Sequence, residues 1–573
     1  MHSKVFLVVL ILPLLLSVVF SASFTKPIIS ESLTSLESEI VGLVNGTSAY
    51  NYDLELEKIA LNHTLSHYSF RAAGSSGANA TADWIMEQFE SFGLEAYKES
   101  FQFTTWDLLS KPTLIIDDDG DPSTTSDQTT INSFQSEHYS WPTPQNGVFA
   151  DLVILPLPPA ANYYELGINP INTAEWNAIN TTGKIVLIGR EVRWSYQWQT
   201  TYKNKLSAQT PAAVIYTWWH DWMSFAPDFF SSGGGYPLSP FGPYYWNLEI
   251  PVGFVNYNDG LWIRNRESSL DVSAKVKIES IIGEGPHYNV VGKLTGYKYP
   301  NKFVIVSSHY DTIMSTGFCD NGAGTAGVIE LARIFSEANK SGLLHSKYTI
   351  LFIPFASEEL GLLGSIDYVT QHKAETGNIV AVINLDCIGS DDLYITETNP
   401  AGEIDLDELV RKAAEYLGMT AMVEPPGGSD HEVFRDPASF GIEDATPVES
   451  SILLISYPLL YNDKWSMGTP GWIHTSYDYS TSTTTMNWVE ATDLENHLKV
   501  AALSIMRIVY LVGDVNFDSI VDISDVVIVV NAIPSYQGSL PPDYEEWNLH
   551  ADIDGNNLVD LVDLVLVIDA VRH

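Results

Sequence analysis

The sequence predicts an α/β protein with a mixed, mostly parallel sheet flanked by helices, a β-rich insert and a small α-helical C-terminal domain. Three observations favour this architecture. Apolar runs separated by helical patterns are typical of parallel strands that are covered on both faces. A stretch rich in Trp, Tyr, Pro and Gly interrupts these runs. Two similar acidic loops, each followed by an apolar segment, lie between residues 512 and 573.

The strands of the main sheet are expected in four segments that are bounded by polar residues: 303–311, 319–324, 348–359 and 379–387. Residues 327–335 have the spacing of an amphipathic helix that would cover this sheet. In parallel sheets, ligands bind outside the carboxyl ends of the strands. A histidine or carboxylate that closes each apolar run is therefore well placed to build a site.

Five residues form a candidate two-metal site: His309, Asp320, Glu359, Asp386 and His474. Four of them lie at the ends of the segments above, and the fifth lies in WIHTSYD. Two imidazoles and three carboxylates suit zinc, and one carboxylate can bridge two ions. Any one of these residues alone would be read as a turn or cap residue, and Asp320 could cap the following helix. Together they predict a metal centre.

The motifs around these residues occur in the order SSHYDT, DNGAGTAG, FASEELGLLGS, NLDCIG, GGSDHEVF and IHTSYD. As a set they resemble the co-catalytic zinc exopeptidases. That family includes secreted leucine-type aminopeptidases, glutamate-carboxypeptidase-like enzymes and, more distantly, glutaminyl cyclases. The resemblance covers residues 50–110 and 285–510. It implies the zinc exopeptidase fold and two Zn²⁺ ions in each catalytic site.

Carried over by motif, the resemblance implies that Asp320 bridges the two metals. His309 and Asp386 would complete the protein ligands of one ion. Glu359 and His474 would complete those of the other ion.

The resemblance also assigns the residues that support the chemistry. Glu358 matches the general base, and Asp311 matches the carboxylate that orients His309. Two positions depart from the family pattern. Ile473 stands where many members have a Tyr that hydrogen-bonds the tetrahedral intermediate. Cys319 stands where several members have an Asp joined to the bridging Asp by a cis peptide.

The N-terminal residues 1–23 are expected to form a signal peptide, since Lys4 precedes the apolar run 5–20 and small residues follow at 21–23. The alternative is a signal anchor that stays in place, although the run is short for a membrane span. No other stretch is long and apolar enough to cross a membrane. We therefore expect a secreted protein, extracellular or at the cell surface.

The chain has 71 acidic and 29 basic residues, which gives a formal charge of −42. This charge argues against nucleic acid or an anionic membrane as a partner. The two cysteines exclude a disulfide-rich scaffold. Cys319 and Cys387 directly flank two predicted ligands, so a disulfide beside the site and a pair of buried thiols are both open.

We expect the peptidase domain in two parts, 33–125 and 285–510, separated by the insert at 130–275. The insert resembles a protease-associated domain in its segments TTGKIVLI, AAVIY and IPVGFV. Its loop at 229–246 either overhangs the substrate cleft or is an ordinary surface loop. The acidic stretch 116–127 superficially suggests a calcium loop. Because Pro122 takes the position that needs a left-handed turn, we expect a solvated turn instead.

The C-terminal segment 512–573 holds two twelve-residue loops, 514–525 and 552–563, with the oxygen spacing of calcium sites. Each loop runs into an apolar helix, and the pattern resembles dockerin repeats. Two Ca²⁺ ions are expected there, and the domain would either dock within the chain or bind a cohesin-like partner. The first set of ligands is Asp514, Asn516, Asp518, Ile520, Asp522 and Asp525. The second set is Asp552, Asp554, Asn556, Leu558, Asp560 and Asp563.

The function that these features favour is a secreted, zinc-dependent aminopeptidase that releases N-terminal residues from peptides. A carboxypeptidase or dipeptidase of the same fold would need a basic residue for the substrate carboxylate, and Arg411 and Arg435 are available. A non-catalytic binding protein is the alternative from a different class. The intact ligand set and base argue against it. A glutaminyl cyclase is disfavoured, because that branch of the family works with a single zinc ion whereas the ligand set here suits two.

Overall fold

The computed structural model describes residues 33–510, except for 66–69, 138, 157–171, 189–195, 218–248, 269, 271, 314, 397, 399–403, 425–427, 458–477, 479 and 481–488. The predicted signal peptide, the loop 229–246, His474 and both calcium loops lie outside the described residues. The chain divides into two compact units, Met1–Ser38 with Val512–His573 and Glu39–Leu511. The fold described below is that of the second unit.

The first sheet has eight strands in the order β1-β10-β12-β11-β13-β16-β14-β15. Its central strands β12, β11, β13 and β16 run parallel, while β1 and β10 form an antiparallel edge. The strands span β1 Glu95–Leu108, β10 Ser280–Leu294, β11 Tyr299–His309, β12 Tyr348–Phe355, β13 Ile379–Leu385, β14 Asp392–Thr396, β15 Ala421–Glu424 and β16 Ser451–Tyr457. The prediction of a mixed α/β sheet is confirmed, and three of the four expected strand segments correspond to β11, β12 and β13.

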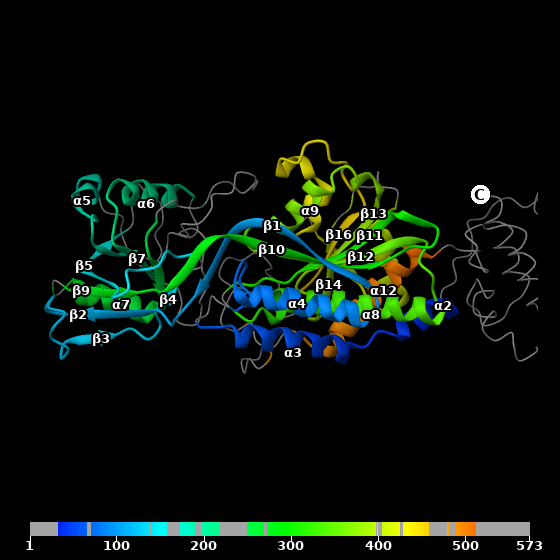
Figure 1. Ribbon diagram of the computed structural model, residues 1–573, viewed down its shortest axis with the longest axis horizontal. Helices are drawn as coiled ribbons and strands as arrows, with labels where there is room; N and C mark the ends of the chain where they lie inside the picture. Colours follow the sequence, from blue (N-terminus) through cyan, green and yellow to red (C-terminus); the bar gives the residue numbers. More distant parts are fainter. Residues whose placement is uncertain are drawn as a thin grey trace, which may run out of the picture. The chain divides into compact units, whose positions relative to one another are not determined.

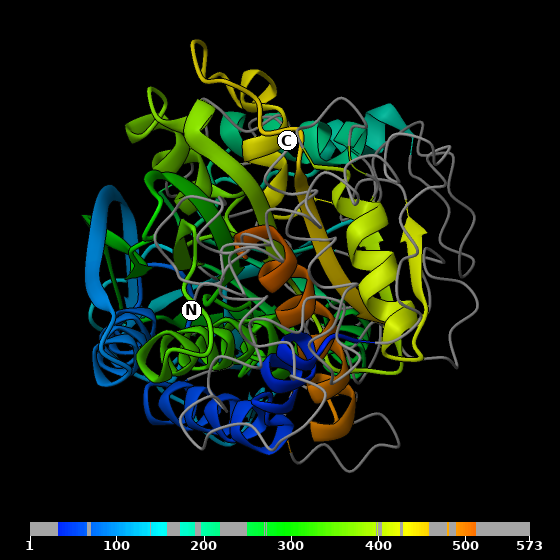
Figure 2. The same ribbon diagram turned by 90° about the vertical axis from the view of Figure 1, so that its right-hand side faces the viewer.

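Helices cover both faces of this sheet. Helices α4 and α8 pack on one face, and α9 and α11 pack on the other (Figure 1). Seen from the side, α12 lies against α3 (Figure 2). The helices are α2 Ser35–Gly42, α3 Gly46–Asn62, α4 Ser76–Ser91, α8 Gly324–Ser341, α9 Leu363–Gln371, α10 Leu406–Tyr416, α11 His431–Arg435 and α12 Ala491–Val509, with short turns η4 Thr376–Asn378 and η5 Pro437–Phe440.

The central strands are buried because helices cover both of their faces. Val304, Ile305 and Val306 of β11 are all inaccessible to solvent. Helix α8 presents Val328, Leu331, Ala332 and Phe335 to this core, as its sequence spacing predicts. Burial of an aliphatic side chain contributes about 1.5–3 kcal/mol, so this layer holds the ends of the central strands in fixed positions.

The second sheet also has eight strands, in the order β3-β2-β9-β5-β6-β7-β8-β4. Strands β5, β6, β7 and β8 are parallel, and β6, β7 and β8 correspond to the three strands expected in the insert. The elements are β2 Thr113–Asp117, β3 Gln128–Thr130, β4 Gln135–Ser136, β5 Val148–Leu155, α5 Thr173–Ala178, β6 Ile185–Ile188, α6 Tyr196–Ala208, β7 Ala213–Thr217, β8 Val252–Val255, α7 Tyr257–Glu267 and β9 Ser273–Lys277. Because β2 pairs with β9, this sheet begins before residue 130.

A long two-stranded ribbon connects the two sheets. Strands β1 and β10 pair from Glu95↔Lys293 to Leu108↔Ser280 and extend from the first sheet toward the second (Figure 1). Just beyond the ribbon, the N–H of Leu109 donates to the carbonyl oxygen of Glu279 at 2.8 Å. The chain therefore leaves the first sheet and returns to it at one place.

Candidate metal centre

Three neighbouring parallel strands bring the predicted metal ligands to one edge of the first sheet. His309 is the last residue of β11, Glu358 and Glu359 follow β12 after a short turn, and Asp386 directly follows β13. Since β12, β11 and β13 are adjacent and parallel, their carboxyl ends meet at this edge.

Asp320 reaches the same place from a short, kinked segment before α8 and not from a strand. The segment 319–324, which the sequence analysis expected to be a strand, lies in η3 Phe318–Ala323 and runs directly into α8. Gly317 has φ 62°, a left-handed conformation that turns the chain before η3, and the backbone is kinked at Asp320 and Asn321. The side chain of Asn321, and not that of Asp320, accepts the N–H of Gly324 at the helix start. Asp320 is therefore left to face the site.

The donor atoms converge on the imidazole of His309. Its Nε2 lies 3.2 Å from Oδ1 of Asp320, 3.4 Å from Oδ1 of Asp386 and 3.9 Å from Oε2 of Glu358. Donor atoms of His309, Asp320 and Asp386 all lie within 4.8 Å of one another, and so do those of His309, Glu358 and Glu359. The described residues thus contain four of the five predicted ligands and the predicted base.

The chemistry of this cluster fits a metal cation. Oδ1 of Asp386 is buried and accepts no hydrogen bond from any described residue. Burying a carboxylate oxygen without a compensating partner is costly. Burial lowers the pKa of His309, but the facing carboxylates of Asp386 and Glu358 outweigh it and raise that pKa well above its usual value. The site therefore favours positive charge at this point, and one imidazole nitrogen with several carboxylate oxygens is a donor set that suits zinc.

Asp311 supports the cluster through both its main chain and its side chain. Its carboxylate accepts the N–H of Glu358 at 3.0 Å and that of Glu359 at 3.3 Å. Nδ1 of His309 lies 3.2 Å from the main-chain oxygen of Asp311 and 3.7 Å from its carboxylate. Because a carbonyl oxygen can only accept, Nδ1 carries the proton and Nε2 is free to ligate. The contact that orients the ring is thus shared between the carbonyl and the carboxylate.

The sequence analysis missed a second supporting carboxylate, Asp478. Its Oδ1 accepts the N–H of Cys319 at 2.6 Å and its Oδ2 accepts the N–H of Asp320 at 3.2 Å. Burial raises the pKa of Asp478 to about 7. The signal in the sequence is its place four residues after His474, in the same motif. No local pattern could show that it reaches back to residues 319–320.

Buried Arg71 holds the loop before η3, and the sequence analysis missed this residue as well. Nε of Arg71 donates to the carbonyl oxygen of Tyr310 at 2.9 Å, and its Nη2 donates to that of Gly317 at 3.1 Å. Ser429 similarly donates to Oδ2 of Asp386 at 2.6 Å. Donors and acceptors from distant segments therefore fix the backbone or carboxylate of each described ligand.

Glu358 is placed as a group that can hold a proton. Burial is the largest influence on it and, with the neighbouring carboxylates of Glu359 and Asp386, raises its pKa well above the usual value. The positive charge of a protonated His309 acts in the opposite direction. A carboxylate with a raised pKa beside a metal cluster has the character of a general base.

The two cysteines are free, buried thiols, so the structure contains no disulfide beside the site. The thiols of Cys319 and Cys387 hydrogen-bond to each other. A cis peptide joins Asp320 to Asn321, one bond later than the family pattern suggests.

Both arginines that could bind a substrate carboxylate already form ion pairs. Arg411 forms an ion pair with Glu408 one turn earlier in α10, and Arg435 lies 2.6 Å from Glu432 in α11. These pairings hold both guanidinium groups along their own helices.

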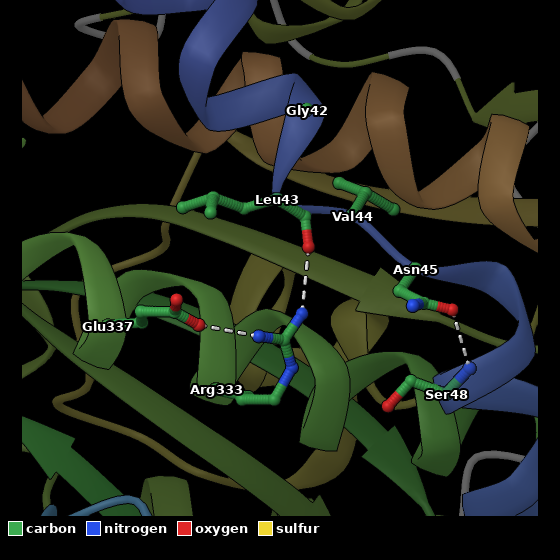
Figure 3. Close-up of a pocket in the computed structure, with 7 residues that line it drawn as sticks. All are labelled: Gly42, Leu43, Val44, Asn45, Ser48, Arg333 and Glu337. Atoms are coloured by element: carbon green, nitrogen blue, oxygen red, sulfur yellow. Dashed lines mark hydrogen bonds and ion pairs between the residues drawn. The ribbon is translucent and has the colours of Figure 1, made fainter.

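A separate pocket lies between α3, α8 and residues 42–45 (Figure 3). Arg333 is the one cationic side chain among the described residues that line it, and this guanidinium is bound to Glu337 at 2.7 Å and to the carbonyl oxygen of Leu43 at 2.8 Å. Glu330 accepts two further hydrogen bonds from it. The pocket therefore has a structural role, and its arginine is already paired.

None of the described helices is both long and apolar enough to cross a membrane.

Residues 289–495 match the model of Peptidase family M28. The chain is similar to Aminopeptidase YwaD of Bacillus subtilis, with 29% identity over 273 residues, which is 46% of this chain and 52% of the relative. It is also similar to Leucine aminopeptidase 2 of Arthroderma otae, with 24% identity over 380 residues, 64% of this chain and 66% of the relative. The chain thus spans about half to two-thirds of the length of these relatives.

Among solved structures, the chain resembles a zinc aminopeptidase from Bacillus subtilis with a TM-score of 0.57. The sequence identity is 22%, and the superposition covers 81% of this chain and 96% of that one. This similarity shows a shared mixed α/β fold.

Proposed function

We propose that this chain, which contains a Peptidase family M28 domain, is a secreted zinc-dependent exopeptidase that removes N-terminal residues from peptides. The observation that carries the proposal is the convergence of His309, Asp320, Glu358, Glu359 and Asp386 at the carboxyl edge of three parallel strands. The relatives whose names include aminopeptidase support the N-terminal direction. The predicted signal peptide supports secretion.

The proposed ligands are those of the sequence analysis. Asp320 would be shared by two Zn²⁺ ions, His309 and Asp386 would hold one ion with it, and Glu359 and His474 would hold the other. When bound, the two ions would lower the pKa of a shared water and polarise the scissile carbonyl. The carboxylate of Asp311 positions the Glu358–Glu359 pair by accepting both backbone N–H groups.

Glu358 carries the proton transfers in this proposal. Its carboxylate accepts a proton from the water that attacks the carbonyl carbon, and it gives this proton to the nitrogen of the leaving amine as the C–N bond breaks. Its Oε2 lies 3.9 Å from Nε2 of His309, beside the residues that would hold the ions. Glu359, the next residue, serves as a ligand, so two adjacent carboxylates have separate roles.

The test is hydrolysis by the zinc-loaded full chain of a peptide with a free N-terminus and of the same peptide with an acetylated N-terminus. An aminopeptidase cleaves only the free peptide, one residue at a time from that end. Cleavage of the acetylated peptide from its C-terminal end would show a carboxypeptidase instead. Binding of either peptide without hydrolysis would show the non-catalytic alternative.

We also propose that residues 512–573 fold around two Ca²⁺ ions held by the two acidic loops. The support is the recurrence of the same oxygen spacing in both loops. A segment of this size has little apolar core with which to oppose the repulsion among its aspartates. Deletion of residues 512–573, followed by thermal unfolding with and without EGTA, tests whether this segment docks on the peptidase domain. An unchanged unfolding temperature of the peptidase domain would show an independent module.

A further inference from the structure

A second cluster of carboxylates lies in the second sheet, far along the chain from the metal centre. Strands β2 and β3 form an antiparallel hairpin in which Asp117 pairs with Gln128. The loop between them, 118–127, is rich in aspartate. Carboxylate oxygens of Asp117, Asp119 and Asp127 lie within 4.8 Å of one another. We call these three residues the hairpin cluster.

Asp117 shows that the hairpin cluster is more than a solvated turn. Its side chain is only 1% exposed, and its Oδ1 is buried and accepts no hydrogen bond from any described residue. Its other oxygen, Oδ2, accepts a hydrogen bond from Nε2 of Gln128 at 3.0 Å. Oδ1 of Asp127 is likewise buried and receives no hydrogen bond within the described part of the chain. Two buried oxygens of the cluster thus receive no hydrogen bond from the described residues, which is costly.

The guanidinium group of Arg266 reaches the same loop, but it pairs with Asp118, with Nε 2.7 Å from Oδ1. Throughout the described ranges, no ion pair joins a Lys or Arg to any member of the hairpin cluster. Three like charges within this distance repel one another, and burial of Asp117 increases the repulsion. A bound cation would offset both the repulsion among the carboxylates and the burial of oxygens that have no donor.

The loop has the shape and the donor type that a hard cation needs. Gly120 has φ +72°, which allows a tight turn between the converging carboxylates. Oδ1 of Asp119 accepts the N–H of Asp121 at 2.8 Å, and this hydrogen bond lowers the pKa of Asp119. The donor set contains oxygen alone, which disfavours zinc. Ca²⁺ takes 6–8 oxygens in flexible geometry, whereas Mg²⁺ demands an octahedron and keeps its waters.

We propose that the hairpin cluster is a Ca²⁺ site in which Asp117, Asp119 and Asp127 are ligands and water completes the coordination. The sequence analysis expected a solvated turn because the loop does not fit the twelve-residue spacing. The structure assigns a different set, with one ligand at the end of β2, one in the loop two residues later and one just before β3. Bound Ca²⁺ would therefore join the two strands of the hairpin at their loop end.

The test counts bound ⁴⁵Ca²⁺ by equilibrium dialysis of the zinc-loaded full chain at about 1 mM Ca²⁺, a concentration that also fills weak sites. The double variant Asp117→Asn, Asp127→Asn should bind one Ca²⁺ fewer per chain than the parent. Because any ions in residues 512–573 are counted in both proteins, the difference isolates the hairpin. The control Asp151→Asn removes an exposed carboxylate from β5 of the same sheet and should leave the count unchanged.

Since Asp117 is buried, the double variant could fail to fold, and circular dichroism identifies that case. In that case the variant Asp119→Asn provides the test, because Asp119 is exposed and the buried residues of the hairpin stay unchanged. This variant should also bind one Ca²⁺ fewer per chain than the parent. The proposal is overturned if a folded variant binds as much Ca²⁺ as the parent. It is also overturned if a tenfold excess of Mg²⁺ displaces the ion that the variants lose.

Discussion

The metal centre and the hairpin cluster are two groups of carboxylates assembled in different ways. In the metal centre, the ligands come from strand ends and a kinked segment that are distant in sequence, and remote residues such as Asp478 hold their backbone. In the hairpin cluster, all three carboxylates lie within residues 117–127, and the hydrogen bonds to Asp117 and Asp119 come from the same hairpin. A site built from distant segments depends on the whole fold, whereas a site within one loop depends on that loop.

This difference predicts how far the effect of a substitution travels. A change in the metal centre should alter metal content or turnover even when the altered side chain is not a ligand. A change in the hairpin cluster should affect the second sheet and leave zinc content unchanged. Substitutions at Asp320, Glu358 and Asp478 test the first half of this statement, in order of decreasing expected effect, and a smaller effect on stability is expected at His497.

The largest effect is expected for Asp320→Asn. If Asp320 bridges two zinc ions, loss of its charge should weaken the binding of both ions. The affinity should fall by more than the roughly 10–100-fold that is typical when a residue supporting a ligand is lost. Metal analysis after dialysis measures the outcome. Loss of a single ion would show that Asp320 is a terminal ligand.

Glu358→Gln should separate chemistry from metal binding. The amide cannot accept the proton, so kcat should fall by about 10²–10⁴-fold while both zinc ions remain bound. The matched variant is Glu359→Gln at the adjacent position, which should lose metal as well as activity. Turnover near the parent value in Glu358→Gln would remove this residue from the mechanism.

Asp478→Asn tests whether a residue that holds the backbone of a ligand can set the zinc affinity. The amide can accept one of the two N–H groups, but its own NH₂ would face the other donor. We expect zinc retention to weaken by about 10–100-fold. Asp53→Asn is the control, because Asp53 is equally buried beside Arg71 but accepts no hydrogen bond from residues 319–320. Equal losses in both variants would indicate a general effect of buried charge.

The smallest effect concerns His497 of α12, whose Nδ1 accepts the N–H of Gly389 at 3.1 Å. Burial lowers the pKa of His497 to about 4, below the ~6.5 of an unfolded chain. The neutral ring therefore stabilises the fold above about pH 6.5, and this stability is lost as the pH falls toward 4. Between pH 7 and 5.5 the loss should be about 1 kcal/mol.

Chemical unfolding of the parent and of His497→Asn at these two pH values measures that loss. The Asn side chain keeps an acceptor for Gly389 and does not titrate. The variant should therefore lose about 1 kcal/mol less between the two pH values. The same pH dependence in both proteins would contradict the prediction.

The sequence alone predicted the strands that carry His309, Glu359 and Asp386, because long apolar runs closed by polar residues are typical of strands buried in a parallel sheet. The prediction for residues 319–324 was wrong, since a short run with Gly322 and Gly324 has too few apolar side chains to specify a strand. Arg71 and Asp478 could not be found because their partners are remote in sequence. The hairpin cluster was hidden because its ligands do not follow a known loop spacing.

The ribbon of β1 and β10 has a consequence for how such a protein can be built and altered. Residues 109 and 279 are joined by a backbone hydrogen bond, so the whole segment between them begins and ends at one point of the first sheet. Replacing that segment by a two-residue turn would close β1 and β10 as an ordinary hairpin with little loop-closure entropy. The first sheet could therefore have acquired the second as a single genetic insertion, and protein engineering could exchange it for another domain at the same two residues.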